Sequence, residues 1–272
     1  MIQIESVSYA HRDGEKLIHA LQNINLTVKQ GEWISVTGAN GSGKSTLSRM
    51  LNGLLVPTKG TVQVAGLDLA DSKNRELVKQ KVQLVFQNPD AQMVGSTPIE
   101  DVAFGLENRG YSSEDMRSRI EEVLRKVGLQ HKFHADVSSL SGGQRQRLAI
   151  ASCLALEPDC LIFDEATSML DPVGRQEIYG IARSLWRKGM TVVWITQRLE
   201  ELPGEGRIAV FEKGTIVYEG DARTLFYHSE LPARLRWELP PVVQIGHLLK
   251  HQGTPVDQLP LCEEDLEDLV CE

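Results

Sequence analysis

A glycine-rich segment near the N-terminus carries the residue types that bind phosphate. Residues 38–46 have the sequence GANGSGKST, which fits the pattern G-x-x-x-x-G-K-[ST]. In such a loop the backbone N–H groups surround the phosphates, Lys44 reaches the β and γ oxygens, and the Ser45 hydroxyl binds Mg²⁺. An apolar alternating stretch precedes the loop at 33–36, and apolar residues at helical spacing follow it over 47–54. Strand, glycine loop and helix, in this order, form the context that a phosphate site requires.

A second glycine-containing segment predicts another contact with an anion. Residues 140–144 have the sequence LSGGQ, in which Ser141 and Gln144 have the spacing of a helix capping box. Capping does not account for Gly142 and Gly143, because a first helical turn tolerates two successive glycines poorly. Glycines let a ligand approach the backbone, and a helix N-terminus favours an anion such as a γ-phosphate.

Two adjacent carboxylates follow a short apolar run. Residues 160–163 predict a buried strand, and Asp164 and Glu165 stand at its end. Because neighbouring residues on a strand point in opposite directions, Asp164 can face Mg²⁺ while Glu165, at the strand end, can polarise an attacking water. The position of this pair after both glycine segments favours a nucleotide site over an ordinary acidic strand end.

In this order the motifs resemble those of the ATP-binding-cassette (ABC) ATPases. Residues 140–144 resemble the signature motif of that family, which serves the nucleotide held by the partner subunit. Residues 168–171 resemble its D-loop, which contacts the other subunit, and Gln87 resembles the Q-loop glutamine, which senses Mg²⁺ and γ-phosphate. The resemblance implies an α/β fold of the P-loop NTPase class, with ATP and Mg²⁺ as cofactors.

Other segments narrow the resemblance to the ATPases of energy-coupling factor (ECF) transporters. Residues 85–92, 100–105 and 164–172 are similar to the first of the two paralogous ATPase subunits of those importers. The resemblance implies an ATP-hydrolysing subunit at the cytoplasmic face of the cell membrane that powers uptake of a vitamin or metal ion. Its implied partners are a second ATPase in a heterodimer, a membrane coupling subunit and a substrate-binding membrane subunit.

Two positions depart from the family pattern. The adenine-stacking aromatic falls on His11, with Tyr9 two residues earlier, and the switch histidine is replaced by Gln197. Glutamine can donate a hydrogen bond to a phosphate oxygen, but it cannot carry a proton near neutral pH. These departures leave open a nucleotide-binding regulatory subunit with one slow site.

The motifs together define a candidate site. Its predicted catalytic residues are Glu165, Lys44 and Gln197, acting by in-line attack of water with charge stabilisation. Three side chains are candidate Mg²⁺ ligands: Ser45, Gln87 and Asp164. The candidate nucleotide contacts are Tyr9, His11, Gly38, Asn40, Gly41, Ser42, Gly43, Lys44, Ser45, Thr46, Gln87, Ser141, Gly142, Gly143 and Gln144.

The elements that position these residues alternate between strand and helix patterns. This alternation predicts a mostly parallel sheet covered by helices. We expect a cassette domain over 1–228, with a helical subdomain at about 88–155, and a C-terminal helical extension over 229–272. The predicted strands lie at 24–28, 34–36, 82–86, 160–163, 192–195, 208–211 and 216–218.

Composition limits the classes of partner. The net charge of −8 offers no basic surplus for phosphate backbones, which argues against nucleic acid as a partner. It also disfavours the other alternative, a soluble cassette ATPase that acts on ribosomes or DNA. No apolar run is long enough to span a bilayer and no signal-peptide pattern opens the chain, so we expect peripheral attachment from the cytosol. The four cysteines lack metal-binding spacing and are interpreted as buried thiols.

Overall fold

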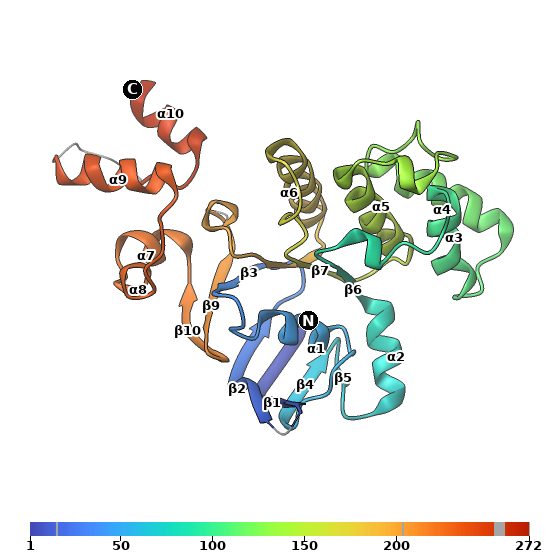
Figure 1. Cartoon of the computed structure of the whole chain (residues 1–272), viewed down its shortest axis with the longest axis horizontal. Coiled ribbons are helices and arrows are strands. Elements are labelled where there is room, and N and C mark those ends of the chain that lie inside the picture. Colours follow the sequence, from blue (N-terminus) through green and yellow to red (C-terminus); the bar gives the residue numbers. More distant parts are fainter. Residues whose placement is uncertain (15, 203, 253–258, 272) are drawn as a thin grey trace.

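The computed structural model describes residues 1–14, 16–202, 204–252 and 259–271 (Figure 1). The strands are β1 (Ile2–Asp13), β2 (Lys16–Val28), β3 (Trp33–Gly38), β4 (Lys59–Val64), β5 (Leu67–Asp68), β6 (Val82–Val85), β7 (Cys160–Asp164), β8 (Thr191–Ile195), β9 (Arg207–Glu212) and β10 (Thr215–Gly220). The helices are α1 (Lys44–Leu51), α2 (Ser72–Lys81), α3 (Pro98–Glu107), α4 (Ser113–Lys126), α5 (Gly142–Ala155), α6 (Pro172–Arg187), α7 (Ala222–Tyr227), α8 (Leu231–Arg234), α9 (Pro241–His251) and α10 (Glu263–Cys271). Within those ranges, no helix combines the length and the apolar character that crossing a bilayer requires.

A six-stranded sheet forms the centre of the fold, with the order β10-β9-β3-β8-β7-β6. Every neighbouring pair is parallel except β9 and β10, which are antiparallel. The prediction of a mostly parallel sheet is therefore confirmed. Six predicted strands lie in it, and their bounds agree with those of β3, β6, β7, β8, β9 and β10 to within two residues at each end.

The predicted strand at 24–28 belongs instead to a second, antiparallel sheet with the order β2-β1-β4-β5. Ile24, Leu26 and Val28 are buried, and the residues between them are exposed. Alternation of this kind is typical of an antiparallel sheet with one face in water, whereas the central parallel strands are buried on both faces. Assigning this segment to the parallel sheet was wrong, because strand propensity does not identify the partner strand.

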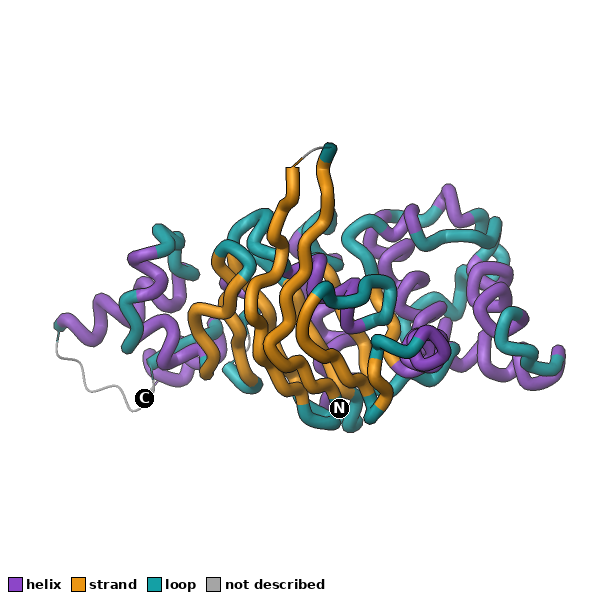
Figure 2. Tube along the Cα trace, turned by 90° about the horizontal axis from the view of Figure 1, so that it is seen from below, coloured by secondary structure: helices purple, strands orange, loops and turns teal. Residues whose placement is uncertain are grey.

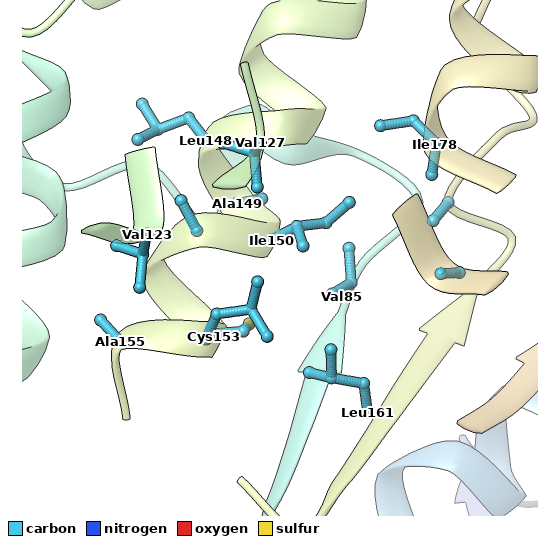
Figure 3. Packing of buried hydrophobic residues seen from close by; sticks show 14 of the residues in the cluster. Val85, Val123, Val127, Leu148, Ala149, Ile150, Cys153, Ala155, Leu161 and Ile178 are labelled. Atoms are coloured by element: carbon cyan, nitrogen blue, oxygen red, sulfur yellow. The ribbon is translucent and has the colours of Figure 1, made fainter. Parts of the chain in front are cut away.

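The central sheet is buried from both sides. Leu161 and Phe163 of β7 pack with α3–α6, while Cys160 and Ile162 of the same strand pack with α1 and the antiparallel sheet. Figure 3 shows Leu161 and Val85 of the sheet packed in one cluster with Ile150 and Cys153 of α5. Figure 2 shows the strands in the middle of the molecule, with helices on both flanks. Each such aliphatic side chain contributes roughly 1.5–3 kcal/mol to folding, so the ends of these strands are firmly placed.

The helices inserted between β6 and β7 form a layer of their own. Ile120, Val123 and Leu124 line the buried face of α4 against α5, as the spacing of these residues predicts. At the first helix the prediction extended too far, because α1 ends at Leu51 and Gly53 follows with φ +77°. A glycine in the left-handed conformation is a common helix stop.

The C-terminal helices share a third core with the central sheet. Leu231 and Val243 pack with Ile208 and Val210 of β9, and the Tyr227 hydroxyl donates to the Pro260 carbonyl at 2.6 Å. Residues 253–258 of the predicted C-terminal extension lie outside the described residues, and the division into 1–228 and 229–272 stays a prediction. Cys153 and Cys160 are buried as expected, but Cys262 is exposed because it precedes the surface helix α10; nothing is described of the Cys271 side chain.

Candidate functional site

The phosphate loop joins β3 to α1, and close packing requires two of its glycines. Gly38 has φ +142°, and a Cβ there would lie 2.1 Å from the Phe211 carbonyl oxygen in β9. Gly43 has φ +107°, and its Cβ would lie 2.4 Å from the Ala20 carbonyl oxygen in β2. Both positions exclude any side chain. Gly41, also in the left-handed region at φ +74°, faces open space.

The turn between β9 and β10 is hydrogen-bonded to the phosphate loop. The Gly214 N–H donates to the Ser42 carbonyl at 3.0 Å, and the Gly214 carbonyl accepts from the Gln22 N–H at 2.7 Å. The Ser42 side chain is buried, and within the described part of the chain its hydroxyl has no hydrogen-bond partner. A buried hydroxyl left unpaired in a loop of backbone donors fits a ligand that supplies oxygen atoms.

Lys44, the first residue of α1, places its ammonium beside the loop it follows. Its Nζ donates to the carbonyls of Gly38 at 2.8 Å and Ala39 at 3.0 Å, and the side chain is 4% exposed. Burial lowers the pKa of Lys44, while the charges of Glu165 and Asp164 act in the opposite direction. A buried ammonium whose own neighbours are mainly carbonyls favours the arrival of an anion.

Asp164, at the end of β7, faces two serines of α1. Its Oδ1 accepts from the Ser45 hydroxyl at 3.1 Å and its Oδ2 from the Ser48 hydroxyl at 2.7 Å. Burial raises the pKa of Asp164, and these two hydrogen bonds only partly offset that shift. Ser48 is a site residue that the sequence analysis missed. Its spacing of three residues from Ser45 on one helix face is the signal that identifies it.

Asp164 and Ser45 fit a magnesium ion. In the described ranges Asp164 is buried and no cationic side chain lies within salt-bridge distance of its carboxylate. A carboxylate and a hydroxyl oxygen are ligands that Mg²⁺ takes together with water and phosphate oxygens. Gln87, the third predicted ligand, is exposed and lies two residues beyond the end of β6, the strand that pairs with β7 up to Val85 and Phe163.

Glu165 leaves the strand in an unusual conformation. Its φ is +52°, a left-handed value that costs a non-glycine residue about 1–3 kcal/mol. Strand alternation alone would turn its side chain away from that of Asp164. Instead the chain turns, the Glu165 N–H donates to the Ile195 carbonyl at 2.9 Å, and the carboxylate lies 3.9 Å from the Lys44 Nζ. Both carboxylates therefore reach the phosphate loop.

Gln197 connects the loop to Glu165. Its Nε2 donates to Asn40 Oδ1 at 2.7 Å and to Glu165 Oε1 at 2.5 Å. A hollow of about 220 Å³ opens beside it, lined by Glu165, Thr167, Ser168, Thr196, Gln197 and Arg198. The structure thus brings together Lys44, Ser45, Asn40, Asp164, Glu165 and Gln197, with Thr46 half-buried in the first turn of α1.

The second glycine segment lies apart from the phosphate loop. Ser141 caps α5, and the predicted capping box with Gln144 is present in both directions. In Figure 1, α5 lies beyond the strands from α1. A Cβ on Gly142 would meet only Leu170, and one on Gly143 only Gly174, both at an ordinary 3.8 Å. Packing among the described residues does not require glycine here, which favours a contact with something outside the chain.

The aromatic pair lies on the strand next to the loop. Tyr9 pairs with Leu21, the neighbour of Ala20, and His11 pairs with Ile18. The rings of Tyr9 and His11 are 6.5 Å apart between centroids, with Tyr9 half-buried and His11 exposed. His11 is thus open to a stacking partner, while Tyr9 packs on the antiparallel sheet.

Comparisons with known proteins agree with this geometry. The family described as ABC transporter matches residues 21–168. An energy-coupling factor transporter ATP-binding protein, EcfA1 of Symbiobacterium thermophilum, is 43% identical, covering 100% of this chain and 96% of that protein.

Two solved structures have the same fold. The structure of cbiO1 from Clostridium perfringens, described as part of the ABC transporter complex cbiONQ, has a TM-score of 0.77 at 32% identity, covering 92% of this chain and 98% of that one. The cassette MJ0796, solved as a dimer bound to ADP and Pi, has a TM-score of 0.74 at 31% identity, covering 82% of this chain and 99% of that one.

Proposed function

Because this chain belongs to the ABC transporter family, we propose that it is the ATP-hydrolysing subunit of an ECF-type importer. Its relatives are ATP-binding subunits of such transporters, and the match extends over the full chain. We propose that it acts at the cytoplasmic face of the membrane, bound to a coupling subunit and a substrate-binding subunit. The cargo would be a vitamin or a metal ion.

The meeting of Lys44, Asp164 and Glu165 around one loop is the observation that carries the enzymatic proposal. The buried ammonium and the backbone donors of the loop would bind the phosphates of ATP. Ser45 and Asp164 would hold Mg²⁺, which supplies charge compensation for the phosphate oxygens. Glu165, which lines the hollow, would orient water and accept its proton during in-line attack.

The signature segment would act in a dimer. Ser141 and the glycines after it lie beside the D-loop, where Met169 is 63% exposed and Val173 at the start of α6 is 65% exposed. Apolar side chains this open beside a glycine-rich helix N-terminus suit a protein partner and its bound nucleotide. The dimeric form of MJ0796 supports this arrangement, and a second ATPase subunit is the proposed partner.

Affinity purification of the tagged chain from solubilised membranes of its own cells tests the proposal. We expect integral membrane subunits to purify with it, and the complex in liposomes to couple ATP hydrolysis to uptake. If the tagged chain is recovered without any membrane subunit and hydrolyses ATP by itself, the result would instead favour the soluble cassette ATPase.

Replacing Gln197 with histidine tests the slow-site alternative, which the Gln197 contacts with Asn40 and Glu165 favour. In the assembled complex, the substitution is expected to raise turnover at this site by up to roughly 10²-fold, the lower end of acid–base effects. A protonated imidazole donates from both nitrogens and carries a charge, so the added rate should fall as pH rises past ~6.5.

The measurement is steady-state ATPase from about pH 6 to 8, bracketing the histidine pKa, with the catalytic carboxylate of the partner ATPase neutralised. Gln197→Asn is the matched control, because it keeps the amide but shortens its reach. An unchanged rate and pH profile in Gln197→His would show that glutamine already supplies the needed hydrogen bond.

A further inference from the structure

Glu201 is a buried carboxylate that no motif accounts for. It ends the short 3-10 turn Leu199–Glu201, which follows the switch loop (the loop after β8 that contains Gln197), and it is 8% exposed. In the described part of the chain no cation pairs with it. Its oxygens instead accept three hydrogen bonds from buried donors, two hydroxyls and one indole N–H.

The two oxygens of Glu201 reach two different loops. Oε1 accepts from the Thr167 hydroxyl at 2.7 Å, and Thr167 directly precedes Ser168, where the D-loop begins. Oε2 accepts from the Thr196 hydroxyl at 2.7 Å, and Thr196 directly precedes Gln197. The Trp194 indole also donates to Oε2, at 3.3 Å, which holds the carboxylate against β8. One side chain therefore bridges the loop after β7 and the loop after β8.

Each of the two bridged loops also makes backbone contacts of its own. The Thr196 N–H donates to the Val36 carbonyl at 3.1 Å, which ties the switch loop to β3. Thr167 follows the left-handed turn at Glu165, and the chain then enters the exposed D-loop. A buried polar group costs free energy unless it is fully hydrogen-bonded, whereas apolar residues would fill the same space without that cost. A carboxylate instead fixes geometry, because its two oxygens bind two hydroxyls and so set the distance between them.

We infer that Glu201 is a positioning residue that sets the switch loop against the D-loop, so that contact of a partner subunit with the D-loop is transmitted to Gln197 and Glu165. The inference rests on the proposed ATPase function. Among the described residues Glu201 does not line the hollow, and its hydrogen bonds reach neither Glu165 nor Gln197. It would therefore act through Thr167 and Thr196. Nucleotide binding depends on the loop at 38–46, which Glu201 does not contact, and should be spared.

The test compares Glu201→Ala and Thr167→Val in the assembled transporter. Both are expected to lower kcat by about 10²-fold, the cost of a misplacement near 1 Å, while the Kd for MgATP stays within about twofold of the parental value. Thr167→Ser keeps the hydroxyl and should restore the parental rate. Glu200→Ala, on the same turn but exposed and paired with Arg198, is the matched control and should have no effect.

The double variant adds a second readout. If the two residues act through one bridge, Glu201→Ala combined with Thr167→Val should be no slower than either single variant. A parental kcat in Thr167→Val would show that the bridge has no role in turnover. A fall in MgATP affinity and in Tm alongside the fall in kcat would show a general structural role. Either result would overturn the inference. Failure of both single variants to fold would do the same. If the parental complex itself does not hydrolyse ATP, the proposed function fails instead.

Discussion

Replacing Glu165 with glutamine is expected to reduce turnover at this ATP site by about 10²- to 10⁴-fold, the range of acid–base contributions. The amide keeps the size and one acceptor oxygen, so Gln197 retains a partner, but an amide does not accept a proton from water. ATP binding should persist, because the phosphate loop and Lys44 are unchanged. The complex should therefore accumulate as a closed dimer with ATP bound.

Single-turnover hydrolysis and sedimentation in the presence of MgATP measure both effects, with the catalytic carboxylate of the partner ATPase neutralised. Glu121→Gln on α4, a half-buried glutamate paired with Arg117 away from the site, is the control for loss of one carboxylate. Hydrolysis at the parental rate in Glu165→Gln would refute the assignment of Glu165 as the base.

Replacing Lys44 with alanine is expected to weaken ATP binding rather than the chemical step alone. The ammonium is already buried beside the Gly38 and Ala39 carbonyls, so its contact with phosphate would be a charge-assisted hydrogen bond made with little reorganisation. Loss of such a bond costs about 2–3 kcal/mol, which corresponds to roughly 30- to 150-fold in Kd.

Titration calorimetry with MgATP measures this change in Kd. Lys126→Ala on α4, which removes an exposed lysine paired with Glu122, controls for the loss of one positive charge. An affinity within about twofold of the parental chain, in a folded Lys44→Ala variant, would contradict the role given to Lys44.

Local patterns predicted most of the central fold. The strands of the six-stranded sheet are short, mainly apolar and bounded by loops, so their existence follows from the sequence. The pairing of strands does not, because it depends on contacts between distant segments. For this reason the segment at 24–28 was assigned to the wrong sheet, although its strand character was correct.

In the candidate site too, local motifs could be predicted from the sequence, whereas contacts between distant segments could not. The phosphate loop, the capping box at Ser141 and the Asp164–Glu165 pair are contiguous, so spacing alone exposes them. The contacts that Glu201 makes with Thr167 and Thr196 cross from one strand end to the next. Nothing in the spacing of these residues distinguishes them from ordinary polar loop residues. The catalytic and ligand roles themselves stay predictions that the variants above would decide.

The packing of the phosphate loop on β9 has a consequence for biosynthesis. The loop occupies residues 38–46, yet the Phe211 carbonyl closes over Gly38 and the Gly214 N–H holds Ser42. Translation delivers the loop early and its support late. While β9 (Arg207–Glu212) is still inside the ribosome, the nascent chain lacks the residues that support the loop. Nucleotide can therefore stabilise the nascent chain only after β9 and the turn that follows it have been synthesised.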